Sequence, residues 1–230
     1  MANIGGCCAL QTAAESKAAT DTVKQFHLPS HHDSNKNWDT LKSLYYILEM
    51  NNARAPVFDA GASADSIILK WLSMLGYSEL YACDIRSRNA QTYKERGIKF
   101  SIQDFTRTNY PDNFFQAITA ISVIEHGVPL NDFIAEMSRI LCPGGVLLVS
   151  TDYWSEPVDC SGIYPYGKEM GEMKVFQVHE IETFCKMARE KELFLCSPLN
   201  LDTNEKVVRW ERVDREYTFA FLAFRKKSGR

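Results

Sequence analysis

The sequence predicts a doubly wound α/β fold around a mostly parallel sheet. From residue 57 onward, short apolar runs of strand length alternate with helical patterns, and the runs end in small or polar residues. Strands that alternate with helices are joined by crossovers, so neighbouring strands run parallel and ligands bind at their carboxyl ends. The composition agrees, because 45% hydrophobic and 24% charged residues are ordinary values for a globular chain.

Five strands are expected in the parallel part of the sheet. They are VFDAG (57–61), ELYACDI (79–85), KFSIQDF (99–105), FFQAITAIS (114–122) and GGVLLVSTDYW (144–154). Helical patterns follow the first, second and fourth of them: SIILKWLSMLG, RNAQTYKERG and NDFIAEMSRIL. An amphipathic helix at 178–192, a strand LFLCSPL and a long strand at 216–226 complete the pattern, with the polar stretch NLDTNEKVVRWERVD between the last two strands. A hairpin-like return makes the final strand antiparallel to its neighbours.

A further helix is expected from Trp38, where WDTLKSLYYILEM has a 3.6-residue apolar period. Its apolar face consists of Trp38, Leu41, Leu44, Tyr45 and Leu48. We expect this helix to cover the sheet and to open a domain that spans residues 38–230.

Residues 1–37 are expected to form a loosely held N-terminal extension. They are rich in Ala, Ser, Thr, Asn and His and show little apolar periodicity. His31, His32 and Asp33 are interpreted as a polar loop, because no further ligand with regular spacing lies nearby to complete a metal site.

Charge and cysteine content exclude several classes of function. The 26 basic and 29 acidic residues give a net charge of −3, which leaves no positive excess for a nucleic-acid backbone. Seven cysteines show no CxxC repeat and no zinc-type Cys/His spacing, so we expect reduced thiols and no metal. No signal-peptide pattern and no membrane-length apolar run is present. The expected setting is the cytoplasm, with no nucleic-acid or membrane partner.

The first strand leads into the loop DAGASADS, which has the character of a ligand-binding turn. Gly61 permits a backbone conformation closed to other residues, and Ala62 is small enough for the chain to approach a ligand. Roughly 20 residues further on, Asp84 ends the second strand, where nucleoside-binding α/β folds place a carboxylate for the ribose hydroxyls. A tight βα turn and a helix cap are the structural alternatives, and a nicotinamide-binding fold shows the same two signals.

The segments that follow resemble class I, S-adenosylmethionine-dependent methyltransferases of the type 11-like group. Asp59 and Gly61 match the start of the family's DxGxGxG loop, although its later glycines are absent. YPDNFFQAITAISVIEHG is similar to the family's P-D-x-x-F-D-x-[VI]…S-V-[IL]-E-H, with Gln116 in place of the usual Asp. LCPGGVLLVS is similar to L-[KR]-P-G-G-x-L-[LV]-[VI]-[ST], with Cys142 in place of the basic residue. The resemblance covers residues 54–226 and implies a seven-stranded, Rossmann-like sheet with an antiparallel last strand.

The resemblance implies S-adenosylmethionine as cofactor and a set of residues that meet it. Asp84 would accept from the ribose, Asp104 from the adenine amino group, and Phe105 would supply a backbone N–H. The complete expected set is Asp59, Gly61, Ala62, Asp84, Ile85, Asp104, Phe105 and Ser122.

Residues after the fourth and fifth strands are expected to face the methyl acceptor. This set consists of Glu125, Asp152, Tyr153 and Trp154. His126 is the candidate general base, because histidine accepts a proton near neutral pH, and an anchoring role in its loop is the alternative. Tyr164 and Tyr166 lie in a Gly- and Pro-bearing stretch that forms either a lid or a plain surface loop.

The predicted function is therefore methyl transfer to a small-molecule or glycan-linked acceptor, with oxygen favoured over nitrogen or carbon. A non-catalytic binding or scaffolding protein with the same fold is one alternative, and the incomplete glycine loop is its best support. A nicotinamide-dependent oxidoreductase is the other. It is disfavoured because the Glu125–His126 and Pro143-Gly144-Gly145 segments fit the methyltransferase pattern.

Overall fold

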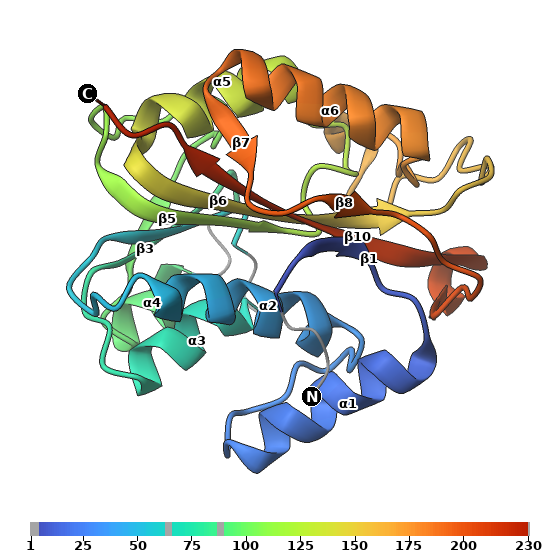
Figure 1. Cartoon of the computed structure of the whole chain (residues 1–230), viewed down its shortest axis with the longest axis horizontal. Helices are drawn as coiled ribbons and strands as arrows, with labels where there is room; N and C mark the ends of the chain where they lie inside the picture. Colours follow the sequence, from blue (N-terminus) through green and yellow to red (C-terminus); the bar gives the residue numbers. More distant parts are fainter. Residues whose placement is uncertain (1–4, 63–65, 87–89, 230) are drawn as a thin grey trace.

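The computed structural model describes residues 5–62, 66–86 and 90–229, and it has a mixed sheet between two layers of helices (Figure 1). Five strands of the sheet are parallel and lie in the order β4–β3–β2–β5–β6. Their bounds are Lys99–Ile102 for β4, Leu80–Asp84 for β3, Val57–Ala60 for β2, Phe115–Ile121 for β5 and Leu141–Tyr153 for β6. The expected parallel core of the sheet is confirmed.

The long last strand, β10 (Arg215–Lys226), runs antiparallel to β6, as expected. Three short strands pair with successive parts of β10, starting from its first residue. They are β9 (Val208–Trp210), β1 (Cys7–Ala9) and β7 (Leu193–Leu195). A two-residue strand, β8 (Leu199–Asn200), pairs with β1. In the described part of the chain, all seven expected strands form, and β1, β8 and β9 are additional.

The helices cover both faces of the sheet, which confirms the doubly wound architecture (Figure 1). One face carries α1 (Ala13–Gln25), α2 (Lys36–Glu49), α3 (Ile67–Met74) and α4 (Ala90–Glu95). The other face carries α5 (Leu130–Ile140) and α6 (Val178–Glu190). Because the helices after β2 and β3 lie on one face and the helix after β5 lies on the other, the winding reverses between β2 and β5.

The N-terminal extension is held firmly, contrary to the expectation from its composition. Ala9 of β1 and the following Leu10 are fully buried, and the Leu10 N–H donates to the Phe219 carbonyl at 2.8 Å. Helix α1 is joined to α2 by the Trp38 indole, whose Nε1 donates to Glu15 at 2.8 Å. Periodicity could not reveal this, because a three-residue strand is too short to show one.

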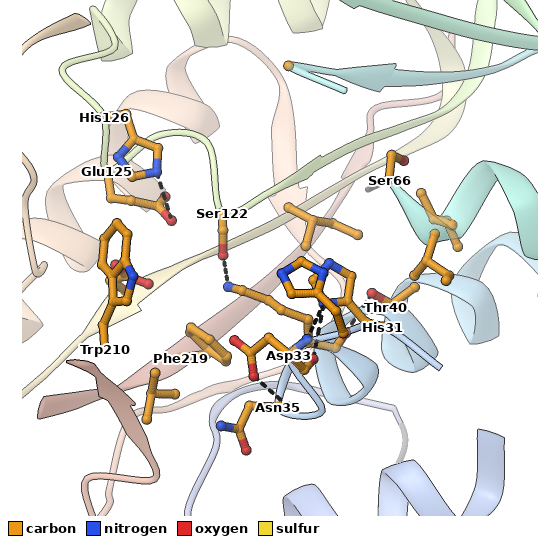
Figure 2. Close-up of a pocket in the computed structure, with 18 of the residues that line it drawn as sticks. His31, Asp33, Asn35, Thr40, Ser66, Ser122, Glu125, His126, Trp210 and Phe219 are labelled. Carbon is orange, nitrogen blue, oxygen red and sulfur yellow. Dashed lines mark hydrogen bonds and ion pairs between the residues drawn. The ribbon is translucent and has the colours of Figure 1, made fainter. Parts of the chain in front are cut away.

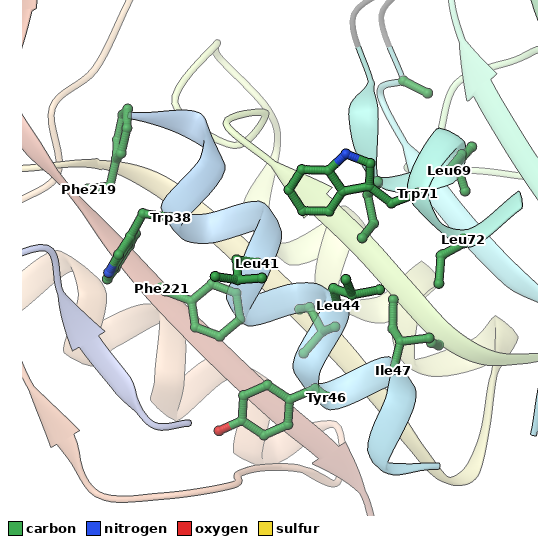
Figure 3. Close-up of a cluster of buried hydrophobic side chains, with 14 of the residues drawn as sticks. Trp38, Leu41, Leu44, Tyr46, Ile47, Leu69, Trp71, Leu72, Phe219 and Phe221 are labelled. Carbon is green, nitrogen blue, oxygen red and sulfur yellow. The ribbon is translucent and has the colours of Figure 1, made fainter. Parts of the chain in front are cut away.

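Helix α2 lies between β10 and α3, so its buried surface is broader than one stripe (Figure 3). Trp38, Leu41 and Leu44 are buried as expected, but Tyr45 and Leu48 are 38% and 44% exposed. Tyr46 and Ile47, which the periodicity had placed outside the apolar face, are buried instead. A helix packed on two sides buries adjacent residues, and a one-faced pattern cannot describe it.

Candidate functional site

A cavity of about 670 Å³ opens at the carboxyl ends of β2 and β5. This is the point where the winding of the sheet reverses, and ligands of doubly wound folds bind there. Three parts of the chain form its wall: the segment from His31 to Lys36, the loops after β2, β5 and β6, and residues 208–219.

Gly61 brings the loop after β2 against the loop after β5. Its φ angle is +72°, and a Cβ at this position would lie 2.9 Å from Cγ1 of Val123. The next residue, Ala62, donates its N–H to the Cys83 carbonyl at 2.9 Å. A side chain at position 61 would therefore be strained and crowded, so the backbone itself forms this wall of the cavity.

Asp59 holds the two ends of the same loop together. It is buried, and it accepts hydrogen bonds from Thr119 Oγ1 at 2.7 Å and from the Ser66 hydroxyl. Burial raises the pKa of the Asp59 carboxyl to about 6, although both hydroxyls oppose this. Asp59 lines the cavity, and these bonds make it an anchor of the loop.

Of the other expected cofactor residues, Ser122 follows β5 and lines the cavity, whereas Asp84, Ile85, Asp104 and Phe105 lie at the carboxyl ends of β3 and β4, further along the same edge of the sheet. Asp84 Oδ1 accepts from the Arg86 N–H at 2.7 Å, and the neighbouring Ile85 side chain is 46% exposed. Asp104 Oδ1 accepts from both the N–H and the hydroxyl of Thr106 at 2.7 Å. Because β3 and β4 pair in parallel, with Asp84 opposite Ile102, both carboxylates lie on the side of the sheet edge where β2 ends.

Two buried carboxylates form the opposite wall of the cavity. Glu125 follows β5 and is 1% exposed, and Asp152 is near the end of β6 and is 3% exposed. Thr151 Oγ1 donates to Glu125 Oε2 at 3.1 Å, and Tyr217 forms a hydrogen bond with the Asp152 carboxylate. Burial raises the pKa of Glu125 to about 7, and burial together with the charge of Glu125 raises the pKa of Asp152.

Lys36, the first residue of α2, brings a positive charge into this part of the cavity. Its ammonium donates to the Ser122 hydroxyl, lies 3.8 Å from Asp39 Oδ2 and lies 3.4 Å from the centre of the Phe219 ring (Figure 2). Lys36 lowers the pKa values of Glu125 and Asp152 and so partly offsets their burial.

The His126 ring lies beside the Glu125 carboxylate (Figure 2), with its Nε2 at 4.0 Å from Glu125 Oε1. Its Nδ1 is buried without a hydrogen-bond partner among the described residues, and its ring meets Tyr166 edge-on at 4.7 Å. Burial and the charge of Lys36 lower the pKa of His126 to about 4. At neutral pH the imidazole is uncharged and a weak proton acceptor, which favours Glu125 over His126 as a base.

The stretch 163–176, which we call the strap, crosses the loops after β5 and β6. Lys174 donates its N–H to the Glu125 carbonyl and Phe176 donates its N–H to the Asp152 carbonyl, both at 2.9 Å. Tyr166 of the strap lines the cavity, whereas the Tyr164 hydroxyl donates to Glu172 at 2.8 Å. The strap therefore fixes the backbones of both carboxylate residues.

Two residues expected at the acceptor are not among the residues that line the cavity. Tyr153 is fully buried, and its hydroxyl donates to the Leu201 carbonyl at 2.9 Å. Since successive strand residues point to opposite faces, Asp152 faces the cavity and Tyr153 faces away. Trp154 is half-buried, and the Lys206 ammonium lies 5.1 Å from its ring.

Several cavity residues were not anticipated from the sequence, above all Lys36, Trp210, Tyr217 and Phe219. Tyr217 and Phe219 have the period-2 spacing of one strand face, which indicates burial but not a cavity. Lys36 lies in the segment that was expected to be loosely held. A single lysine in a polar stretch does not indicate from the sequence that its side chain lines a cavity.

The comparisons with known proteins agree with this architecture. A family model described as a methyltransferase domain matches residues 58–149. No curated protein matches the sequence. In the described part of the chain, no helix has the length and apolar character needed to cross a membrane, and no group of three or more His, Cys, Asp or Glu side chains is placed to hold a metal ion.

Three solved structures illustrate the similarity of the fold. The [4+2]-cyclase SpnF is 16% identical, with 94% of this chain and 93% of that chain covered and a TM-score of 0.65. The 1,6-didemethyltoxoflavin-N1-methyltransferase of Burkholderia thailandensis, with bound 1,6-didemethyltoxoflavin and S-adenosylhomocysteine, is 16% identical, with coverage of 95% and 92% and a TM-score of 0.60. The geranyl diphosphate C-methyltransferase of Streptomyces coelicolor, in complex with Mg²⁺, geranyl diphosphate and S-adenosylhomocysteine, is 14% identical, with 86% of each chain covered and a TM-score of 0.59.

Proposed function

We propose that this chain is a class I, S-adenosylmethionine-dependent methyltransferase that methylates a hydroxyl group of a small-molecule or glycan-linked acceptor held in the cavity, and the match of a methyltransferase-domain model to residues 58–149 supports this. The observation that carries this proposal is the composition of the cavity. A glycine-bearing loop forms one wall and two buried carboxylates form the other. The seven cysteines are free, which supports a reducing compartment such as the cytoplasm.

The residues at the sheet edge fit S-adenosylmethionine. We assign the backbone at Gly61 and Ala62, together with Asp59 and Ser122, to the methionine end, because all four line the cavity. We assign Asp84 to the ribose hydroxyls and Asp104 and Phe105 to the adenine. The exposed side chain of Ile85, next to Asp84, supports this assignment because the adenine ring can pack against it. When bound, the cofactor supplies an electrophilic methyl group.

The other half of the cavity is suited to the acceptor. Aromatic side chains of Tyr166, Trp210 and Phe219 line it beside Glu125 and Asp152. Aromatic surface holds the body of a small molecule, and a carboxylate accepts the proton that a hydroxyl must lose. The protein has to align the acceptor and exclude water, and the strap above the two carboxylates serves both needs.

The test of the proposed function is calorimetry with S-adenosylhomocysteine, S-adenosylmethionine and NADH. Both sulfur nucleosides should bind, and NADH should not. Asp84→Ala should weaken binding of S-adenosylhomocysteine at least roughly tenfold, or about 1.4 kcal/mol, because a carboxylate–hydroxyl hydrogen bond to the ribose is lost.

Asp112→Ala is the matched control for this measurement. Asp112 pairs with Arg139 at 2.6 Å and precedes β5, at the amino end of that strand. Its removal should leave nucleoside affinity unchanged. Binding of NADH without either sulfur nucleoside would refute the proposed function.

A further inference from the structure

We propose that Glu125 is the residue that takes the proton of the acceptor, and that Asp152 acts with it as a pair that shares one proton. This inference rests on the proposed function and names the catalytic group of the same cavity. The geometry carries it: both carboxylates line the cavity, both are at least 97% buried, and the strap binds the backbone of each.

The Glu125 carboxylate is held in one orientation. Thr151 Oγ1 donates to its Oε2 at 3.1 Å, and Oε1 faces His126 Nε2 at 4.0 Å. The Lys174 N–H fixes the carbonyl of the same residue at 2.9 Å. A general base must be preorganised in this way, because proton transfer requires hydrogen-bond distance and alignment in the reacting complex.

Charged and titratable groups of the neighbouring elements act on this pair or line the same cavity. They are Lys36 and Asp39 of α2, His126 of the same loop, Tyr166 of the strap, Tyr217 of β10, and Arg209, Glu211 and Arg212 in the segment before β10. Among these groups Lys36 is the positive charge that acts on both carboxylates. Both carboxylates line the same cavity and burial disfavours the charge of each, while the charge of Glu125 further disfavours ionisation of Asp152, so one retains a proton while the other is ionised under the influence of Lys36.

The Asp152 carboxyl is the member of the pair suited to retain the proton. Its pKa is raised by burial and by the charge of Glu125, although Lys36 and the hydrogen bond with Tyr217 oppose this rise. Glu125 has a pKa near neutrality, so its ionised form is available and is still basic enough to take a proton. His126 is kept uncharged and closes the side of Glu125 that faces the strap.

The step balances as follows. Glu125 takes the hydroxyl proton of the acceptor while the acceptor oxygen forms a bond to the methyl carbon and the bond between methyl and sulfur breaks. The electron pair of the broken bond remains on sulfur, and the acceptor leaves as a methyl ether. Glu125 then returns its proton to solvent when the products depart.

The first test measures the carboxyl groups directly and needs no acceptor. Protein labelled with ¹³C at the glutamate carboxyl is titrated by NMR with S-adenosylhomocysteine bound, and the Glu125 resonance is identified by its absence in Glu125→Gln. Its midpoint should lie near neutral pH. In protein labelled at the aspartate carboxyl, the Asp152 resonance, identified by its absence in Asp152→Asn, should titrate at a higher pH, and its midpoint should fall in Glu125→Gln because the charge of Glu125 is removed. An Asp152 midpoint that does not respond to Glu125→Gln would overturn the shared-proton pair.

The second test measures single-turnover transfer from methyl-labelled S-adenosylmethionine to a small-molecule cell extract. Glu125→Gln should lower the rate by on the order of 10²–10⁴-fold while S-adenosylhomocysteine affinity is retained. Glu190→Gln, on the exposed surface of α6, is the matched control and should leave the rate unchanged. A rate in Glu125→Gln close to wild type, with a large loss in His126→Asn, would overturn the assignment of the base. Absence of any nucleoside binding in the wild-type protein would instead refute the proposed function, and the NMR titration without nucleoside would still test the pair.

Discussion

Gly61 is a residue at which the loop after β2 depends on one backbone conformation, with a φ of +72°. Substitution by Ala should cost about 1–2 kcal/mol of stability through strain at positive φ. It should also weaken S-adenosylhomocysteine binding. The new Cβ would lie 2.9 Å from Val123 Cγ1, so the loop after β2 and the loop after β5 would have to move apart. Gly97→Ala is the matched control, since Gly97 has a φ of +70° and nothing within 4 Å of an added Cβ. Thermal unfolding and calorimetry should show similar destabilisation in both variants and lost affinity in Gly61→Ala alone.

Glu125 should make the stability of the protein depend on pH. Its pKa rises from the ordinary 4.5 to about 7 on folding, so the folded state binds the proton more tightly than the unfolded chain. This contribution to the free energy of unfolding is complete below about 4.5 and is lost as the pH rises through about 7. The difference in unfolding free energy between wild type and Glu125→Gln, measured by urea denaturation, should therefore decline over this window. A difference that is flat between these pH values would contradict the buried, protonated state.

Several of the expected site residues lie together where chemistry and position along a strand coincide. Gly61, Ser122, Glu125 and Asp152 all end or follow strands, and the structure brings them to one cavity. Tyr153 fails to join them because a strand alternates its faces, and the choice of face depends on the packing of the whole sheet.

Strand β1 is the element that ties the N-terminal segment to the rest of the fold. Leu10, directly after β1, is fully buried, and its carbonyl accepts from Thr218 Oγ1 at 2.6 Å. Leu10→Ala should cost about 2–5 kcal/mol, the range for a large buried aliphatic residue. Leu48→Ala, at a site that is 44% exposed, should change stability by no more than about 0.5 kcal/mol. Equal effects of the two substitutions on the urea midpoint would show that the extension is loosely held after all.

Elements that belong to the repeated alternation of apolar runs and helical patterns were predictable from the sequence, whereas isolated short strands outside it were not. The alternation predicted β2 to β6 and their helices, although β2 and β4 have only four residues each. β1 and β8 have three and two residues; β1 pairs with β10, and β8 in turn pairs with β1, so both depend on tertiary packing. Lys36 was missed for the same reason, since only the docking of the N-terminal segment brings it to the cavity.

The whole molecule assembles its cavity from segments at both ends of the chain and from the sheet between them. His31 and Lys36 come from the N-terminal part, and Trp210 and Phe219 come from the last hairpin (Figure 2). The part of the cavity at the ends of the parallel strands is formed by elements whose sequence pattern is regular, and those elements were predictable. The rest of the cavity combines distant segments, so only tertiary packing determines which side chains face it.

The most direct test of the central claim is transfer of a labelled methyl group. The protein is incubated with methyl-labelled S-adenosylmethionine and fractions of a small-molecule extract, and each fraction is examined by mass spectrometry. The account predicts that one compound gains the labelled methyl group on oxygen, with an equal amount of S-adenosylhomocysteine formed. Binding of S-adenosylhomocysteine with no label transferred to any fraction would contradict it and would identify the chain as a binding protein that retains the fold without the reaction.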